Sequence, residues 1–490
     1  MLTKTRSQSL TEQLAARFSE RIRDRLLAPG ARLPSIRECA RQHGLSPHTV
    51  VAAYDQLLAQ GLVDARKNRG FFVRGARAAP GRLDAAAAAG DASRSGVSGT
   101  GPTRAATPGA GPASPSNATA LIRGMFQRIS DKPQPGLGVF PPEWLQTEFL
   151  PAALRRVCGS RELQSFSLQY GEPAGDLGLR HALSQRLSAI HIPARPEQII
   201  TTVGATQALD IVSRTLLRAG DPVMVEEPGW AVEFVRLEAL GMRILPVPRG
   251  PDGPDLGVMA RYGEIHAPKL FVSVSVLHNP TGYSLSPGSA HRLLQLANRY
   301  QFHIVEDDTY SHIAPEHATR LSALDGLQRT IYVSGFAKIL APNWRVGFLA
   351  APLNLTERLL DTKLLSTLTT PALLEKAMAI CIEQGQLRRH AERIRGKLDA
   401  ARGRSVKLAL AAGCRFASEP SGLFGWVETG VDTDALAQRM LDEGYLLAPG
   451  ALFHAGHKPS TLMRINFATT QDARFWNCFS RLRDARKAGR

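Results

Sequence analysis

Cysteine, aromatic residues and long apolar runs are all scarce in this chain of 490 residues. The five cysteines are scattered and form no CxxC pair, which argues against a disulfide framework or a zinc site and fits a reducing compartment. No apolar run reaches the roughly 18 residues that a bilayer crossing needs. The polar start, MLTKTRSQSLTEQLA, lacks the apolar core of a signal peptide. We therefore expect a cytoplasmic protein with no membrane segment and no metal site.

Length and charge indicate how many domains the chain has and what kind of partner it binds. The chain is too long for one ordinary domain, so two or more are expected, and a hydrophobic fraction of 43% is enough for a large core. The formal net charge of +17 indicates a polyanionic partner or an anionic ligand. The basic excess is densest before residue 74.

Large apolar residues are almost absent between residues 76 and 119, where Ala, Gly, Pro, Ser and Thr dominate. Such a stretch cannot bury enough surface to offset the entropy lost on ordering, so it is predicted to be a disordered, flexible linker. It separates a first part, residues 7–75, from a second part, residues 120–490.

The first part has the pattern of three short helices followed by a hairpin. Apolar residues recur at every fourth position over residues 14–26, with Leu26 the last, and Pro29 then ends that helix. Ser35 begins a capping box for a second helix, and Ser46 caps a third. Two apolar strands joined by a basic tip follow within residues 62–73. This order predicts a winged helix-turn-helix, although periodicity alone also allows a small helical dimerisation module.

The segment RLPSIRECARQHGLSPHTVVAAYDQLLAQGLVDARKNRGFFV resembles the GntR family of winged-helix regulators over its whole length. The resemblance implies a double-stranded DNA operator as partner, with contacts from the start of the second helix, the start of the recognition helix and the wing. These residues are Arg37, Ser46, His48, Thr49, Arg66, Lys67, Arg69 and Gly70. Many members carry Arg where this chain has Pro47 and Ala52, so we expect weaker direct readout of bases and more important wing contacts.

Apolar strand-like runs alternate with amphipathic helical stretches in the second part. The runs cover residues 199–203, 223–226, 270–276, 303–306 and 331–333. This alternation predicts an α/β domain with a mostly parallel sheet covered by helices. Functional groups in such a sheet gather beyond the carboxyl ends of the strands.

Distinctive residues follow each of these runs. A helix that opens after Gly204 offers free N–H groups to a phosphate. A tryptophan after the second run could stack on a planar ring, although a lone Trp more often belongs to the core. The residues are, in chain order, Ala205 and Thr206, Trp230, Asn279 in HNPTG, Asp307 and Tyr310, and Lys338 with Arg345 seven residues later.

In this order and spacing the motifs resemble the fold-type I pyridoxal-phosphate enzymes, the aspartate-aminotransferase-like class, from about Leu121 onward. The resemblance implies a large subdomain at about 165–370 and a small α+β subdomain from the segments on either side. It implies that pyridoxal 5'-phosphate is bound covalently by the catalytic Lys338, with Asp307 on the ring nitrogen. The other implied cofactor contacts are Asn279 and Tyr310 to the ring oxygen, Ala205, Thr206 and Arg345 to the phosphate, and Trp230 stacked on the ring.

Two more matches and one departure complete the resemblance. Tyr170, in YGEPAG, occupies the position at which this class has a tyrosine that reaches the phosphate in the neighbouring subunit. The resemblance therefore implies a homodimer. Arg464, in LMRINF, matches the arginine that grips a substrate carboxylate; a surface ion pair is the alternative. The class usually has Ser or Thr three residues before the lysine and often Ser directly before it, where this chain has Gly335 and Ala337. Ser334 is displaced by one position, so we expect looser retention of the cofactor.

A GntR-type head, a linker and an aminotransferase-like body in this order resemble the MocR subfamily. The resemblance implies a DNA-binding transcription regulator whose body senses an amino acid, an amine or the cofactor. A working aminotransferase with an appended DNA-binding domain is the main alternative, since Lys338, Asp307 and Arg464 are all present. A scaffold with an inactive pocket is a third. Regulation is favoured because a sensor needs both a pocket and an output, and weak transamination would be compatible with it.

Overall fold

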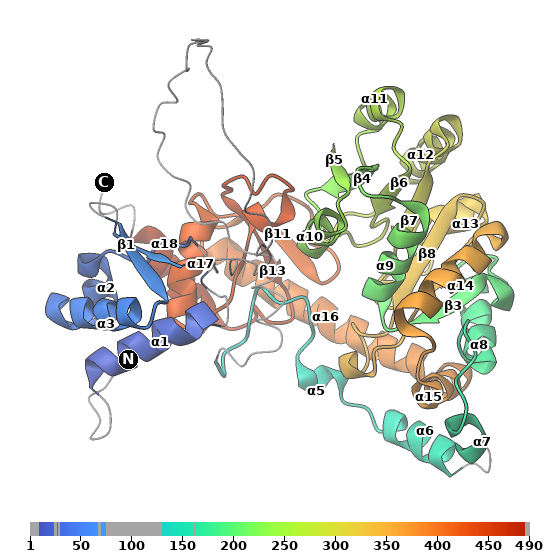
Figure 1. The fold of residues 1–490 in the computed structure, drawn as a ribbon, viewed down its shortest axis with the longest axis horizontal. Helices are drawn as coiled ribbons and strands as arrows, with labels where there is room; N and C mark the ends of the chain where they lie inside the picture. The colour runs from blue at the N-terminus through green and yellow to red at the C-terminus, as the bar shows by residue number, and fades with distance from the viewer. Residues whose placement is uncertain are drawn as a thin grey trace, which may run out of the picture. The chain divides into compact units, whose positions relative to one another are not determined.

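The computed structural model describes residues 9–23, 27, 30–66, 70–74, 130–159 and 163–485. The chain forms two compact units, residues 1–123 and 124–490 (Figure 1). The predicted linker, residues 76–119, lies outside the described residues, and so do Leu26, Pro29, Lys67 and Arg69.

The first unit contains three helices and a two-stranded antiparallel sheet within its described residues. These are α1 (Leu10–Arg23), α2 (Ile36–His43), α3 (Pro47–Ala59), β1 (Val63–Arg66) and β2 (Gly70–Val73). The strands reach further than predicted, because Arg66 pairs with Gly70 across the ladder. Both residues therefore belong to the strands rather than to the tip.

Local hydrogen bonds explain the helix boundaries of this unit. Ser35 Oγ accepts from Glu38 N at 3.3 Å, and Ser46 Oγ accepts from Thr49 N at 3.1 Å, so each serine satisfies a free N–H at the start of its helix. Tyr54 Oη donates to Pro34 O at 2.9 Å and ties the third helix to the loop before the second. The predicted winged helix-turn-helix is confirmed.

A seven-stranded sheet forms the centre of the second unit within its described residues, with strand order β3-β9-β8-β7-β6-β4-β5. Every neighbouring pair is parallel except the two that involve β9. The bounds are β3 (Ile199–Thr202), β4 (Pro222–Glu227), β5 (Arg243–Pro248), β6 (Leu270–Ser273), β7 (His303–Asp307), β8 (Thr330–Gly335) and β9 (Gly347–Ala350). The mostly parallel sheet is confirmed. The run at 270–276 ends early, because Val274 N leaves the ladder and donates to Glu226 Oε2 at 2.8 Å.

Helices cover both faces of this sheet (Figure 1). One face carries α9 (Ala205–Leu216), α10 (Ala231–Ala239) and α14 (Leu353–Thr367). The other carries α11 (Leu256–His266), α12 (Pro287–Tyr300), α13 (Leu321–Asp325), α8 (Leu177–Ser188) and α15 (Ala372–Glu383). Alternate strand residues supply the two cores, as the two-residue period of a strand requires.

A second, four-stranded antiparallel sheet has the order β10-β11-β13-β12. Its strands are β10 (Arg415–Phe416), β11 (Phe424–Glu428), β12 (Ala448–Pro449) and β13 (Leu462–Asn466). The remaining helices are α5 (Pro142–Leu145), α6 (Phe149–Cys158), α7 (Leu163–Ser167), α16 (Gln386–Ala411), α17 (Thr433–Asp442) and α18 (Ala473–Asp484). Among the described helices, none combines the length and apolarity that crossing a membrane requires.

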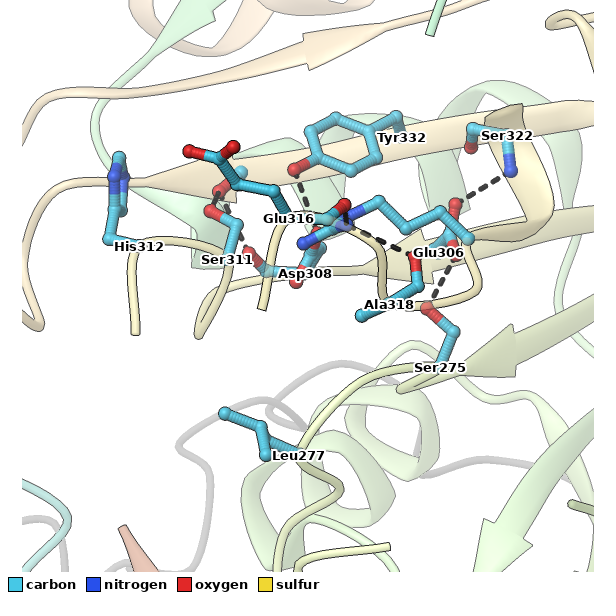
Figure 2. A network of polar contacts seen from close by, with 12 residues as sticks. Ser275, Leu277, Glu306, Asp308, Ser311, His312, Glu316, Ala318, Ser322 and Tyr332 are labelled. Carbon is cyan, nitrogen blue, oxygen red and sulfur yellow. Dashed lines mark hydrogen bonds and ion pairs between the residues drawn. The ribbon is translucent and has the colours of Figure 1, made fainter. Parts of the chain in front are cut away.

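A buried polar network fixes the carboxyl end of β7 (Figure 2). Arg320 Nε donates to Asp308 Oδ2 at 2.6 Å, and Tyr332 Oη donates to the same oxygen at 3.0 Å. The Glu306 carboxylate accepts from the backbone N–H groups of Leu321 and Ser322 at the start of α13. Burial raises the pKa of Asp308, while the Arg320 charge opposes that rise. The ionised Asp308 side chain therefore depends on its arginine.

Replacing this arginine should test that dependence. Arg320→Ala leaves the fully buried Asp308 carboxylate without its ion-pair partner, so we expect a loss of about 3–5 kcal/mol in the free energy of unfolding. Urea unfolding followed by circular dichroism measures it. The control is Arg299→Ala, whose pair with Glu264 is exposed and spans 3.9 Å; it should cost at most about 1 kcal/mol. Equal losses in the two variants would contradict the interpretation.

Candidate functional site

An anion-binding geometry lies where β3 leads into α9. Ala205 and Thr206 are the first two residues of that helix, so their N–H groups have no partner within it. Arg345 lies directly beside this helix end, with Nη2 donating to Val203 O at 3.1 Å. The helix terminus and the guanidinium together can hold a phosphate.

Three glycines let the backbone segments meet at this point. A Cβ on Gly204, whose φ is +81°, would lie 2.3 Å from Arg345 Nη2, and one on Gly347 would lie 2.5 Å from the Gly204 carbonyl carbon. A Cβ on Gly335 would lie 3.6 Å from Ala205 N. Position 335 is therefore adjacent to the anion site, but glycine offers no hydroxyl there.

Ser334 does not replace that hydroxyl. Its Oγ donates to Asp308 O at 2.9 Å and lies 3.2 Å from Ser311 Oγ. Successive side chains of a strand point to opposite faces, so the serine lies on the side of Asp308 and Ser311 and not on the side of the start of α9.

Asp307 and Trp230 line one small cavity between the sheet and α10. Asp307 is the last residue of β7, and Trp230 is the N-cap of α10. Burial raises the pKa of Asp307 to about 6; two hydrogen bonds from Thr309 lower it, and the nearby Glu233 raises it. A buried carboxylate and an aromatic side chain thus line the same small cavity, and both are groups that can bind a cationic heterocycle.

Lys338 follows β8 and lies in the same region as Tyr310. Its Nζ is 5.8 Å from the centre of the tyrosine ring and donates to Gly138 O at 2.9 Å. Burial and, to a smaller extent, the positive charge of Arg464 lower the pKa of Lys338 against the opposing charge of Asp307, and the result is a pKa of about 8. The neutral, nucleophilic form of the lysine is therefore far more populated near physiological pH than it is for an exposed lysine, although the charged form still predominates there.

Arg464, on β13, is buried in the site, which contradicts the surface-ion-pair alternative. Its Nη1 donates to Asn279 Oδ1 at 2.9 Å, its Nη2 donates to Gly136 O, and its guanidinium lies between the rings of Phe424 and Phe453 at 4.3 and 5.1 Å. Its Nε has no hydrogen-bond partner among the described residues. Burial lowers the pKa of Arg464 to about 10. A buried cation without a carboxylate partner suits an anionic ligand.

The structure thus joins the predicted residues in three groups. These are the anion site, the Trp230–Asp307 cavity, and Lys338 with Tyr310, Asn279 and Arg464. Tyr170 is outside these groups and is 83% exposed. The sequence analysis missed two types of contributor. The first is side chains that line the site, namely Glu226, Glu233, His278, Phe424 and Phe453. The second is the carbonyl groups of Gly136 and Gly138, which no side-chain motif could have indicated.

The six predicted DNA contacts that the structure describes lie on the surface of the first unit. Arg37, Ser46, His48 and Arg66 are exposed, and Thr49 and Gly70 are partly exposed. Arg66 stacks on Phe72 at 4.5 Å, which holds its guanidinium over the sheet. Ser46 is also the N-cap of α3, so any contact with DNA would come from a hydroxyl that already accepts a hydrogen bond from Thr49 N.

Two family profiles match the chain. The profile of "Aminotransferase class I and II" matches residues 146–482, and that of "Bacterial regulatory proteins, gntR family" matches residues 10–73. The HTH-type transcriptional regulator YdcR of Escherichia coli is 27% identical, over 93% of this chain and 94% of its own length. The probable rhizopine catabolism regulatory protein MocR of Rhizobium meliloti is 29% identical, over 77% of this chain and 73% of its own length.

A solved structure agrees with these matches. LysN, the α-aminoadipate aminotransferase of Thermus thermophilus, complexed with N-(5'-phosphopyridoxyl)-L-leucine, superimposes with a TM-score of 0.68 and 26% identity. The match covers 76% of this chain and 96% of LysN. The fold-type I architecture expected for the second unit is therefore confirmed. The chain belongs to the aminotransferase class I and II family and carries a domain of the GntR family of bacterial regulatory proteins in front of it, the arrangement of the MocR subfamily.

Proposed function

We propose that this chain is a DNA-binding transcription regulator whose aminotransferase-like unit holds pyridoxal 5'-phosphate and senses an amino acid or amine. The observation that carries the proposal is the buried Arg464. It has no carboxylate partner among the described residues, and it donates a hydrogen bond to Asn279. Arg464 and Lys338 also donate to two carbonyl groups of one short segment, those of Gly136 and Gly138. The same chain carries an exposed, basic winged helix. A pocket for an anionic ligand and a DNA reader on one chain are what a sensor requires.

The residues fit the cofactor at each end. The start of α9, with Ala205, Thr206 and Arg345, suits the phosphate, and Trp230 offers a ring face. Asp307 can hold a proton on the ring nitrogen, because a buried carboxylate gains most from a cationic partner. The cofactor, when bound, supplies an aldehyde that reacts with amines and a ring that withdraws electrons.

The other residues bind and orient. Lys338 provides the amine that bonds to the cofactor, and Asn279 and Tyr310 are the donors that would reach the ring oxygen. Arg464 would hold the carboxylate of an amino-acid effector as a fork donor. Gly335 and Ala337 add no hydroxyl to the phosphate site, so we propose that the cofactor is held less tightly than in members with serine there.

The first unit would bind an operator in double-stranded DNA. The exposed start of α3, with Ser46, His48 and Thr49, would enter the major groove. Arg37 would contact the backbone or a base edge, and the wing residues Arg66, Lys67, Arg69 and Gly70 would reach the minor groove. As a DNA-binding regulator, the protein would act in the cytoplasm.

A homodimer would complete the site. Tyr170 is 83% exposed and Leu365 is 91% exposed. The stretch around Tyr170 adjoins the residues after α14, since a Cβ on Gly171 would lie 3.4 Å from Thr370 O. A second copy that covers these apolar side chains would bring its own Tyr170 to the neighbouring phosphate, as in the resembled class.

A working aminotransferase is the second candidate. It is favoured by one observation: Lys338, Asp307 and Arg464 all lie in the site, in a fold shared with LysN. The two candidates differ in turnover, not in cofactor binding.

Cofactor uptake should depend on pH through Lys338. Since burial lowers its pKa to about 8, the reactive neutral amine is lost as the pH falls below that value. We expect the rate of pyridoxal-phosphate uptake by the apoprotein to rise with pH and level off above about pH 8. Stopped-flow absorbance of the visible band measures it. Lys338→Ala should show no such band; a band that persists would assign the cofactor to another residue.

Arg464 should govern the response to amino acids. In a titration of the cofactor-loaded protein with a panel of amino acids and amines, Arg464→Ala should keep the visible band. It should lose affinity for the responding amino acid by about 3–5 kcal/mol, which is more than roughly a hundredfold. Arg481→Ala, an exposed arginine of α18, is the control. A normal response in Arg464→Ala would point to a simple amine or the cofactor itself. Turnover on the order of 1–1000 per second by the wild type would favour the enzyme.

Arg37→Ala and Arg66→Ala should weaken DNA binding without changing the cofactor band. Each lost phosphate contact should lower the salt dependence of binding by about one unit. Fluorescence anisotropy with a duplex selected by the full chain from a random pool measures both quantities. Arg388→Ala, on an exposed turn of α16, should bind like the wild type. Equally tight binding by a chain that lacks residues 1–75 would refute the assignment of the head.

A further inference from the structure

One stretch of chain, residues 130–139, lies along the edge of the small subdomain; we call it the strap. Gly136 N donates to Leu446 O at 2.7 Å, and Leu446 N donates to Gln134 Oε1 at 2.8 Å. Asn466 Nδ2 donates to the carbonyl groups of Leu137 and Val139 at 2.9 and 2.7 Å. The strap is thus held by the strand that carries Arg464 and by the chain before β12.

The strap also contacts Arg464 and Lys338, the side chains that would bind the effector and the cofactor in the proposed function. Gly136 O accepts from Arg464 Nη2, and Gly138 O accepts from Lys338 Nζ at 2.9 Å. Both acceptors are backbone carbonyl groups, only two residues apart. The strap thus accepts hydrogen bonds from two basic side chains that form no ion pair with a carboxylate among the described residues.

The geometry of Arg464 makes this contact a competition. A guanidinium grips a carboxylate with two nitrogens along one edge, and both of its forked edges include Nη2. One edge also uses Nη1, which Asn279 occupies; the other uses Nε, which is buried and without a partner in the described part of the site. Nη2 carries two N–H groups and Gly136 O accepts from it, so a carboxylate on the Nε–Nη2 edge would share this nitrogen with the carbonyl, and the two negatively polarised acceptors would repel each other at close range.

We propose that the strap is a built-in competitor of the ligand, displaced from Arg464 when an α-carboxylate binds. The inference rests on the proposed function, because it takes Arg464 as the carboxylate grip. In chain order the strap is the first described stretch of the second unit, and residues 75–129 join it to the head. Ligand binding therefore acts on the end of the chain that leads to the DNA-binding unit.

Such competition lowers the apparent affinity for the ligand. When a binding-competent state holds only a fraction of the molecules, the apparent dissociation constant rises by the inverse of that fraction. Weakening the strap elsewhere should increase this fraction and leave the ligand's own contacts intact. Lys132 and Gln134 allow this, because they hold the strap to Glu443, Gly444 and Leu446 and touch neither Arg464 nor Lys338 in the described contacts.

Hydrogen–deuterium exchange of the full-length protein tests the displacement directly. The two probes are N-(5'-phosphopyridoxyl)-glycine, which carries an α-carboxylate, and pyridoxamine phosphate, which lacks one. We expect the first probe to speed exchange at the amides of Gly136 and Leu446, whose hydrogen bonds hold the strap. The second probe should leave these amides protected. Equal protection with both bound probes would overturn the proposal.

Calorimetry with the same probes gives the second readout. Lys132→Ala/Gln134→Ala should bind the carboxylate probe about three- to tenfold more tightly and pyridoxamine phosphate unchanged. The matched control, Lys269→Ala/Gln295→Ala, removes an exposed ion pair and an exposed hydrogen bond elsewhere in the same unit and should change neither affinity. Gly136→Ala is a second route to the same result, since its Cβ would lie 2.5 Å from the Leu447 backbone.

The outcomes separate the two proposals. If neither probe binds, the cofactor site is wrong and the strap proposal is overturned with it. If both probes bind but neither strap variant gains affinity for the carboxylate probe, the proposed function stands and the strap proposal is overturned. A gain for both probes alike would also overturn it, because the competition is with the carboxylate.

Discussion

The parallel arrangement of β4, β6, β7 and β8 is the constraint on which the candidate site depends. Parallel strands end at one edge of their sheet, so residues far apart in the sequence meet there. Trp230, Asn279, Asp307 and Lys338 each follow or end one of these strands. The antiparallel β9 returns the chain so that Arg345, just before it, reaches the start of α9. The small subdomain then contributes Arg464 from a second sheet.

Buried charge is distributed unequally over the two faces of β7. Asp307 faces α9 and α10, whereas Glu306 and Asp308 face α13, where their partners are arginine, tyrosine, serine and backbone N–H groups. Glu306 accepts hydrogen bonds through both carboxylate oxygens, and Asp308 does so through Oδ2. Asp307 has only Thr309 as a hydrogen-bond donor in the described structure, which leaves it as the carboxylate that gains most from a bound cation.

Much of this could be read from the sequence, and the limits have physical causes. The strand runs and the motifs after them predicted the sheet and the grouping of Asp307, Lys338 and Arg345, because strand ends and helix starts are local features. The strands β5 and β9 were not predicted. The early end of β6 was not predicted either, because it depends on a contact between strands: Glu226, on β4, accepts from the N–H of Val274, just after β6. The carbonyl contacts of Gly136 and Gly138 could not be predicted, because every residue has a carbonyl and only the fold selects these two.

Arg464 and Asn466 lie two residues apart on β13, so their side chains point to the same face, and both donate hydrogen bonds to carbonyl groups of the strap. In the proposed sensor, the carboxylate site and the anchor of the strap therefore belong to one strand. The sensitivity of such a receptor can be adjusted without altering its specificity. Substitutions at residues 130–134 would shift the ligand concentration that triggers a response, while the pocket that chooses the ligand stays the same. Closely related chains could thus respond to one metabolite at different thresholds.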